Sequence, residues 1–268
     1  MLNLKLWQSK PRYVPLDQPT QSQPDMAPRP LVRIVALNTK GGCGKTTLCT
    51  NLAGYYASHG YHTALLDADV QGSSLQWLRN RGDQPAAITA IDGAQRRGRV
   101  TRSFQVHAPH TTERLIVDTP AALDSFALKE FTRDADAILI PVLPSAIDIH
   151  AVSRCIADLL LVGRVERRAE RVAVVANRVK KNTLIYEKLQ HFLQGLDIAF
   201  ITSLRDTQNY VHAAETGLSI HELATHRNHQ DLRDWEPLIQ WLEARPRAAP
   251  AHGLPEAVSH QAGDQVEG

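Results

Sequence analysis

A glycine-rich segment, Lys40-Gly41-Gly42-Cys43-Gly44-Lys45-Thr46-Thr47, follows a short apolar run and leads into a stretch of helical period. Glycines let the backbone turn so that several N–H groups converge on one point, and the following helix adds its positive end. In a strand–loop–helix unit of this kind, the Lys45 ammonium can contact nucleotide phosphates and the Thr46 hydroxyl can bind Mg²⁺. The segment therefore predicts a loop that cradles a polyphosphate. The alternative is a glycine-rich turn that precedes Lys-Thr by chance.

The middle of the chain alternates short β-branched runs with longer stretches of helical period, which is typical of βα units around a mostly parallel sheet. The runs are almost continuously apolar, which indicates strands covered by helices on both faces. Strands are expected at residues 32–37, 63–66, 114–117, 137–142, 172–176 and 198–201. Helices are expected at residues 45–58, 73–81, 125–133, 147–161, 184–193, 208–215 and 230–243. The sequence predicts an α/β fold of the P-loop NTPase class, with a mostly parallel twisted sheet flanked by helices on both faces.

Two parts of the chain do not fit this alternation. Residues 82–113 are typical of a surface segment, with one possible strand near 104–106. The two ends are rich in proline, because six of the fifteen prolines lie in the first 30 residues and three more in the last 24. Such segments bury too little apolar surface to offset the entropy of ordering them. We expect a flexible tail over 1–30, one folded domain over 31–244 and a second flexible tail over 245–268.

Composition excludes several classes of protein. The 268 residues carry 30 basic and 28 acidic side chains, so any surface for nucleic acid must be a local patch. The three cysteines, Cys43, Cys49 and Cys155, form no C-x-x-C pair, which argues against a disulfide scaffold or a zinc ribbon. No apolar run approaches the length of a membrane span, and the N-terminus has no signal-peptide pattern. A reduced, cytoplasmic setting is expected.

The glycine spacing departs from the commonest phosphate loop, G-x-x-x-x-G-K-[ST], because a lysine stands directly before Gly41-Gly42. In this respect K-G-G-C-G-K-T-T resembles the deviant Walker motif of the ParA/MinD family of ATPases, with Lys40 in the place of the family's signature lysine. Later segments resemble the same family: D-x-D-x-Q-G at 67–72, the Walker B segment at 115–120, the strand at 135–142, an Asn at 177 and G-x-S-x-x-E at 217–222. The resemblance covers residues 32 to about 240.

The resemblance implies specific roles for the acidic residues and for Lys40. Asp118, at the carboxyl end of a strand, would hold Mg²⁺ through water, unless it is a helix N-cap. Asp69 would position the attacking water and Asp67 would support the metal shell, unless both belong to a solvated turn. Lys40 would reach across a dimer interface to the partner's nucleotide, unless it is an ordinary surface lysine.

The resemblance also implies the residues around the cofactors, ATP and Mg²⁺. Asn177 would contact adenine, since an amide offers both a donor and an acceptor, although an Asn that only begins a loop is the alternative. Cys43 is a small residue in a tight loop and receives no chemical role. The expected nucleotide residues are Gly41, Gly42, Cys43, Gly44, Lys45, Thr46, Thr47, Asn177 and Arg178. The expected catalytic residues are Lys40, Lys45 and Asp69, and the expected metal residues are Thr46, Asp67 and Asp118.

ParA-like proteins bind DNA without sequence preference through basic residues of the assembled dimer, by contacts to phosphates. Two stretches of this chain are rich in basic residues. For each, the alternative to DNA contact is a charged face exposed only to solvent. One contains Arg79, Arg81, Arg96, Arg97, Arg99 and Arg102. The other contains the candidate DNA residues Arg164, Arg167, Arg168, Lys180 and Lys181. No membrane partner is expected, because the end of the chain is proline-rich and partly acidic where a MinD-like protein carries a basic amphipathic helix.

The sequence thus predicts a slow, partner-stimulated ATPase that forms a homodimer with ATP, binds nucleoid DNA, and segregates or positions a cargo through an adaptor. The cargo would be a plasmid, a chromosome region or a protein assembly. The alternatives are a metabolic enzyme of the dethiobiotin synthetase type, a regulator of a membrane machine such as cellulose synthesis, and a scaffold without enzymatic activity. A nitrogenase-reductase-like protein is disfavoured, because Cys155 lies on the apolar stripe of its helix.

Overall fold

The computed structural model describes residues 29–82, 84, 86–94, 108–163, 165, 170–196, 198–223 and 228–244. Most of the two expected tails and the possible strand near 104–106 lie outside these residues. The domain boundaries at 30/31 and 244/245 therefore stay predictions.

A seven-stranded sheet forms the centre of the molecule, in the order β3-β2-β4-β1-β5-β6-β7. Every pair of neighbouring strands is parallel. The strands are β1 (Val32–Ala36), β2 (Thr63–Asp67), β3 (Ile88–Asp92), β4 (Arg114–Asp118), β5 (Ala137–Val142), β6 (Val172–Val179) and β7 (Ala199–Arg205). The expected P-loop α/β fold class is confirmed.

Strand β3 corrects the interpretation of residues 82–113 as surface segment. It lies at the edge of the sheet and pairs with β2 from Thr63↔Ile88 to Asp67↔Asp92. Thr89 and Ala90 are exposed, and only Ile91 of the five residues is buried. An edge strand that is half exposed lacks the continuous apolar run by which the inner strands were found.

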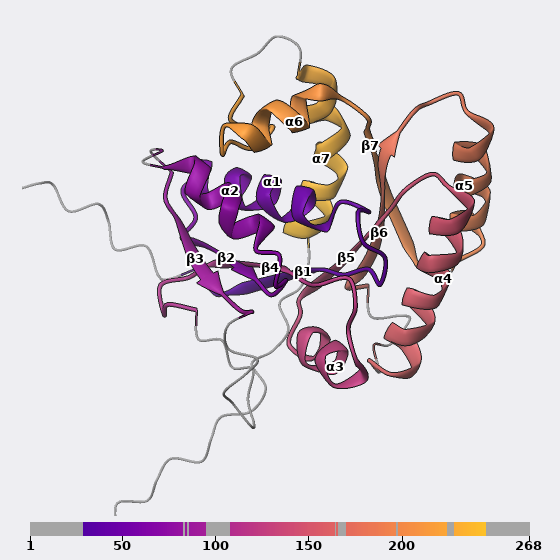
Figure 1. Ribbon diagram of the computed structural model, residues 1–268, viewed down its shortest axis with the longest axis horizontal. Helices are drawn as coiled ribbons and strands as arrows, with labels where there is room; N and C mark the ends of the chain where they lie inside the picture. The colour runs from indigo at the N-terminus through magenta and orange to yellow at the C-terminus, as the bar shows by residue number, and fades with distance from the viewer. Residues whose placement is uncertain are drawn as a thin grey trace, which may run out of the picture.

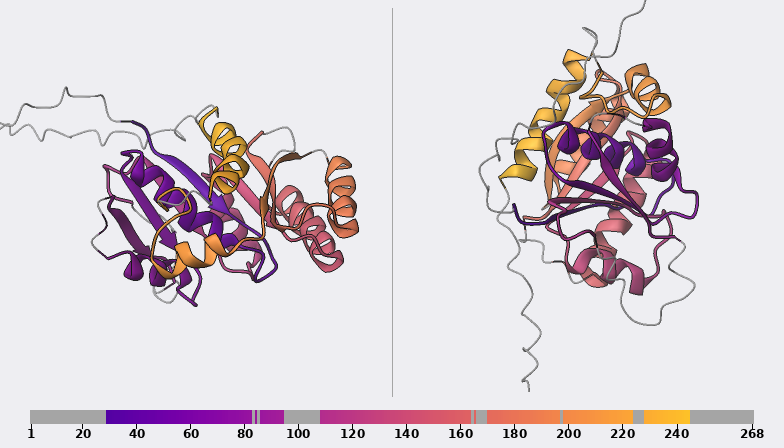
Figure 2. Two further views of the ribbon diagram at one scale, coloured as in Figure 1. Left: turned by 90° about the horizontal axis from the view of Figure 1, so that it is seen from above. Right: turned by 90° about the vertical axis from the view of Figure 1, so that its left-hand side faces the viewer.

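Seven helices cover the two faces of the sheet in the described part of the chain (Figure 1). They are α1 (Lys45–Ser58), α2 (Ser73–Arg81), α3 (Ser125–Arg133), α4 (Ala146–Leu161), α5 (Leu184–Gln194), α6 (Gln208–Glu215) and α7 (His229–Glu243). Helices α1, α2, α6 and α7 lie on one side of the sheet, and α3, α4 and α5 on the other (Figures 1 and 2).

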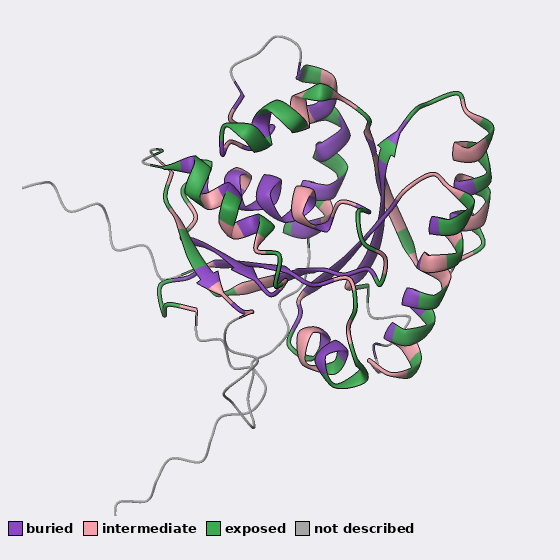
Figure 3. Cartoon of the chain, viewed as in Figure 1, coloured by how far each residue is buried: buried purple, intermediate pink, exposed green. Residues whose placement is uncertain are grey.

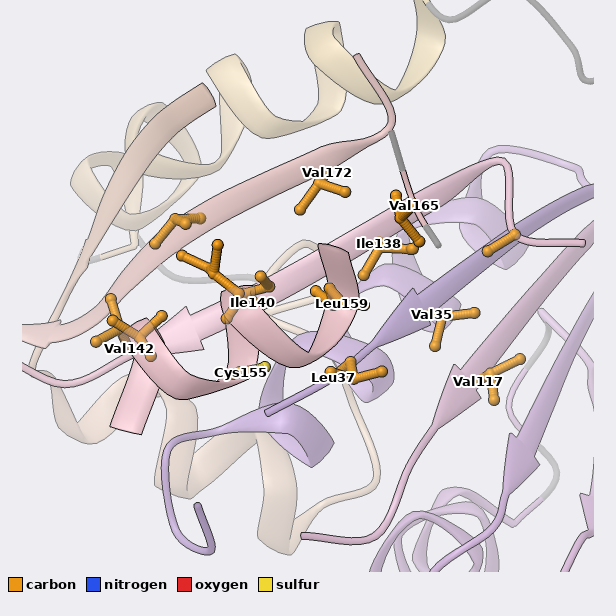
Figure 4. Packing of buried hydrophobic residues seen from close by; sticks show 14 of the residues in the cluster. Val35, Leu37, Val117, Ile138, Ile140, Val142, Cys155, Leu159, Val165 and Val172 are labelled. Carbon is orange, nitrogen blue, oxygen red and sulfur yellow. The ribbon is translucent and has the colours of Figure 1, made fainter. Parts of the chain in front are cut away.

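Two hydrophobic cores lie on opposite faces of the sheet, because successive side chains of a strand point to opposite faces. Val35 and Leu37 pack with α3, α4 and α5, whereas Ile34 and Ala36 pack with α1, α2 and α7. The inner strands β2, β4, β5 and β6 are therefore buried along most of their length, and exposed residues gather on the outer faces of the helices (Figure 3). Figure 4 shows Cys155 and Leu159 of α4 against the strand residues of the first core. Each fully buried Leu, Ile or Val contributes about 1.5–3 kcal/mol.

The segment that resembles G-x-S-x-x-E lies after α6 and packs against α1 and α2. Glu222 accepts hydrogen bonds from the Ser219 amide and hydroxyl at 2.9 and 2.8 Å and from both terminal nitrogens of Arg81 at 2.5 and 3.0 Å. A Cβ on Gly54 would lie 2.5 Å from Ser219, and one on Gly217 would lie 2.2 Å from the backbone nitrogen of Arg81. The motif is thus explained by close packing around a buried ion pair.

Candidate nucleotide-binding site

The phosphate loop follows the central strand β1 at the carboxyl edge of the sheet. Gly42 and Gly44 adopt left-handed backbone angles, with φ of +76° and +101°, which favour glycine. Gly44 is the N-cap of α1, and no side chain of the described residues caps this helix. The helix therefore offers its first N–H groups to the space beside the loop. Lys45 is almost buried, and its ammonium donates to the carbonyls of Asn38 at 3.2 Å and Lys40 at 3.3 Å.

Asn38, which the sequence did not single out, anchors the loop to the neighbouring strand. Its amide nitrogen donates to the Pro141 carbonyl of β5 at 2.7 Å, and its amide oxygen accepts from the Lys40 backbone N–H at 3.0 Å. A buried amide that satisfies two backbone groups fixes where the loop leaves the sheet. A single Asn after a strand carries no pattern of its own, so no signal in the sequence pointed to this residue.

Asn177 lies against the phosphate loop, within β6. Its Nδ2 donates to the Cys43 carbonyl at 3.0 Å, and its Oδ1 accepts from the Arg178 N–H at 2.9 Å. A Cβ at position 44 would lie 1.9 Å from Nδ2, so Gly44 is required by this contact as well as by its φ angle. Asn177 thus supports the loop, and its contact with adenine stays a prediction. The following Arg178 is exposed, with a left-handed φ of 51°.

Cys43 is fully buried in the loop, and its thiol contacts the Lys40 carbonyl at 3.3 Å. Burial raises the pKa of this thiol, so the loop does not hold a reactive thiolate. The residue fills space in the turn.

Asp118 lies at the end of β4, next to Asp67 in the register of the sheet. One of its oxygens, Oδ2, accepts from the Thr46 hydroxyl at 2.7 Å and from the Ser74 hydroxyl at 2.6 Å. Burial raises the pKa of Asp118 to about 6, against the opposing effect of the two hydroxyl donors. A hydroxyl and a carboxylate side by side form a donor set that suits Mg²⁺, which takes few protein ligands beside phosphates and water. Ser74 was not among the expected site residues.

Asp67 ends β2 and Asp69 lies in the turn that follows, and the two carboxylates accept different hydrogen bonds. Asp67 is fully buried, and its two oxygens accept from the backbone N–H groups of Asp69 and Leu75, both at 3.0 Å. It therefore shapes the turn into α2, and its place in the metal shell stays a prediction. Asp69 is half-buried and accepts from the Gln71 N–H at 3.0 Å.

Lys40 forms an ion pair with a residue of its own chain that the sequence analysis missed. Its ammonium lies 2.6 Å from Oδ2 of Asp148, in the first turn of α4, and the Ser145 hydroxyl donates to the same oxygen. The Asp148 carboxylate is buried, and its Oδ1 has no partner among the described residues. Lys40 keeps about a third of its side chain exposed.

The candidate DNA residues are only partly described. Arg164, Arg167 and Arg168 lie outside the described residues, as do Arg96, Arg97, Arg99 and Arg102. Lys180 is exposed and lies 3.6 Å from Asp206, and Lys181 lies 3.9 Å from Asp234. These two lysines are thus each beside an acid of the same chain. Arg81 is buried in its pair with Glu222.

The site has three features that define a P-loop nucleotide-binding protein. A glycine loop follows the central strand of a parallel sheet, a helix starts beside that loop, and a Lys-Thr pair lies against a strand-end aspartate. The chain belongs to the CobQ/CobB/MinD/ParA nucleotide-binding domain family, whose pattern matches residues 34–220. It is an ATPase of the ParA/MinD type.

Two relatives share the name maintenance of carboxysome distribution protein A. The protein from Gloeobacter kilaueensis is 34% identical over 199 residues, covering 70% of this chain and 83% of the relative. The one from Halothiobacillus neapolitanus is 28% identical over 202 residues, covering 74% and 90%.

Solved structures share the fold at lower identity. The cell division protein MinD of Aquifex aeolicus has a TM-score of 0.57 at 19% identity and covers 81% of this chain and all of its own. The ATP complex of a McdA variant from Cyanothece has a TM-score of 0.58 at 16% identity and covers 80% and 96%. In the described part of this chain, no helix is both long and apolar enough to cross a bilayer.

Proposed function

We propose that this ATPase binds ATP with Mg²⁺, forms a homodimer with the nucleotides at the interface, binds DNA without sequence preference in that state, and positions a protein assembly such as a carboxysome. The observation that carries the proposal is Lys40, which stands at the rim of the phosphate loop and is partly exposed. From this place a lysine can act on a second subunit that covers the loop. The cargo is inferred from the two carboxysome-distribution relatives, which match most of their length.

Exposed apolar side chains at the same end of the sheet support the proposed homodimer. Val70, Phe126 and Ile147 are 80%, 59% and 73% exposed, and they follow β2, β4 and β5 respectively. Because the strands are parallel, these three apolar side chains belong to the edge of the sheet that carries the phosphate loop. Exposed apolar residues grouped around a site favour an interface over a free surface.

Within this dimer we assign the reaction to the following groups. The loop amides and Lys45 would hold the phosphates, and Thr46 with Asp118 would hold Mg²⁺, which would supply positive charge beside the phosphates. Asp69 orients the attacking water, because it is the accessible acid of the turn that Asp67 shapes. Lys40 leaves Asp148 and approaches the nucleotide of the partner.

We further propose that the protein acts in the cytoplasm on the nucleoid and that residues 31–244 are the folded unit. DNA binding would use Arg178, Lys180 and Lys181 or the arginines at 164, 167 and 168, with an ATPase-stimulating partner that ends the bound state. An iron–sulfur carrier, a function named in some more distant relatives, is not favoured, since all three cysteines are buried.

The test measures the affinity of the Asp69→Ala variant for random duplex DNA, by fluorescence anisotropy with ATP or ADP. The variant should retain ATP without hydrolysing it. Affinity should rise with ATP and fall with salt in proportion to the phosphates contacted. Two sets of basic residues are neutralised separately: Arg178, Lys180 and Lys181, and the arginines at 164, 167 and 168. Each change should flatten the salt dependence of the affinity for DNA, whereas the control Lys129→Ala on α3 should not. Binding to anionic vesicles without binding to DNA would overturn the nucleoid proposal, and binding to neither would favour a metabolic enzyme.

A further inference from the structure

Ser74 is a buried hydroxyl that the roles assigned above leave unused. It is the second residue of α2 and has no exposed surface. A serine in the first turn of a helix commonly caps that helix. Here Gly72 is the N-cap, the Asp67 carboxylate accepts from the Leu75 N–H of the first turn, and the Ser74 hydroxyl donates away from the helix to Asp118 at 2.6 Å.

Two hydroxyls from different elements donate to one carboxylate oxygen. Thr46 at the start of α1 and Ser74 at the start of α2 both bind Oδ2 of Asp118. A carboxylate oxygen has two lone pairs, so this pair of donors saturates Oδ2 and fixes the orientation of the group. Hydrogen bonds to an ionised acceptor are among the stronger ones in a protein.

Ser74 also lies directly after the turn that contains Asp69, at the start of α2. The turn leaves β2 at Asp67 and enters α2 at Ser73. It is held at one end by Asp67, which accepts from the Asp69 and Leu75 amides. It is held at the other end through Ser74 to Asp118. A change in the orientation of the Asp118 carboxylate is thus passed to the start of α2 and to the turn.

We propose that Ser74 is a positioning residue that orients Asp118 for Mg²⁺ and couples metal binding to the turn of residues 69–72. The proposal rests on the role of Asp118 given under the proposed function. It predicts that Ser74 matters to nucleotide affinity only when Mg²⁺ is present.

The experiment compares Ser74→Ala with Ser73→Ala, which removes an exposed hydroxyl one residue away. Affinity for a fluorescent ATP analogue is measured with Mg²⁺ and with EDTA. Ser74→Ala should weaken binding about tenfold in Mg²⁺, as expected for loss of one hydrogen bond to a charged group, and leave binding in EDTA unchanged. Ser73→Ala should change neither, and Ser74→Thr should restore part of the affinity. Hydrogen exchange should show that Mg²⁺ protects residues 69–72 in the original protein and less so in Ser74→Ala.

Equal affinities of Ser74→Ala and the original protein in Mg²⁺ would overturn the proposal, and so would an equal loss with Mg²⁺ and with EDTA, which indicates a purely structural role. The Asp118→Ala variant distinguishes a failure of the Ser74 proposal from a failure of the proposed metal site. If Asp118→Ala removes the effect of Mg²⁺ but Ser74→Ala does not reduce it, only the role of Ser74 fails. If Asp118→Ala has no effect on Mg²⁺ dependence, the metal site itself is wrong.

Discussion

Several buried polar residues lie at the carboxyl edge of the sheet and have partners from distant parts of the chain. Asn177 binds the Cys43 carbonyl, and Asp118 binds Thr46 and Ser74. A buried polar group without a hydrogen bond costs about 1–3 kcal/mol, so these contacts hold the loop in one conformation before nucleotide binds. Preorganisation of this kind favours tight binding of phosphate.

At the same scale, Lys40→Ala separates nucleotide binding from dimerisation. Lys45 and the loop amides remain, so affinity for ATP should change by less than about threefold, while ATP-dependent dimerisation should be lost because no lysine reaches the partner. Light scattering after size-exclusion chromatography with ATP measures this, with Lys129→Ala as the control. A Lys40→Ala protein that dimerises like the original would exclude the proposed role.

His221 gives the folded protein a pH dependence. Burial lowers the pKa of its ring to about 4, with a smaller effect of nearby His59, and the ring packs edge-on against Tyr55 and Trp235. The unfolded chain takes up this proton near pH 6.5, so the free energy of unfolding should fall as the pH decreases from about 6.5 toward 4. Between pH 7 and pH 5 the loss from this residue is about 2 kcal/mol.

Urea unfolding of His221→Phe at both pH values tests this expectation. The variant should lose about 2 kcal/mol less between pH 7 and pH 5 than the original protein, since Phe cannot be protonated. Comparing the two proteins removes the contribution of Asp118, which acts in the opposite direction in this range because its pKa is raised. The exposed His62 provides the control, and a His221→Phe protein that behaves like His62→Gln would contradict the assignment.

At the scale of elements, the parallel strands bring their loops to one edge, and two helices begin there at groups of the site. Helix α1 begins at Lys45 and Thr46, and α2 begins beside Ser74. The far end of α2 is held by the pair of Arg81 with Glu222. Movement of α2 is thus limited at both ends, and the turn before it is the element best placed to respond to ligands.

Glu222→Gln should therefore destabilise the whole domain. It leaves the Arg81 guanidinium, whose side chain is only 3% exposed, without a charged partner. Breaking a buried ion pair from one side costs about 3–5 kcal/mol. Thermal unfolding should show a lower melting temperature for Glu222→Gln than for Glu215→Gln, which changes an exposed acid of α6. The double variant Arg81→Met/Glu222→Gln should recover part of the loss. No difference between the two single variants would mean that the pair contributes little.

At the scale of the whole molecule, the two cores on the faces of the sheet account for the packing of every described element. Deleting residues 1–28 and 247–268 should thus leave basal ATPase activity and the melting temperature nearly unchanged. Differential scanning calorimetry of the shortened protein tests the boundaries. A melting temperature lower by about ten degrees or more would show that a tail packs on the domain.

The sequence by itself determined the architecture and the place of the glycine-rich loop within it. Among the described residues, the strands other than β3 follow from continuous apolar runs, because burial on both faces of a sheet requires apolar side chains throughout. The helices of the described residues follow from the helical period of their apolar positions. The phosphate loop and the strand-end acids follow from residues adjacent in the chain. Strand β3 was not predicted, because it lies half-exposed at the edge of the sheet and its five residues form no continuous apolar run.

Only the tertiary structure decided how the site residues are held. Lys40 pairs with Asp148, 108 residues away, Asn177 supports the loop 134 residues before it, and Ser74 binds Asp118 across 44 residues. A single polar residue has no periodicity, and its partner is fixed by which strands lie side by side. Local propensity sets which elements form, whereas sheet order and register set which side chains meet.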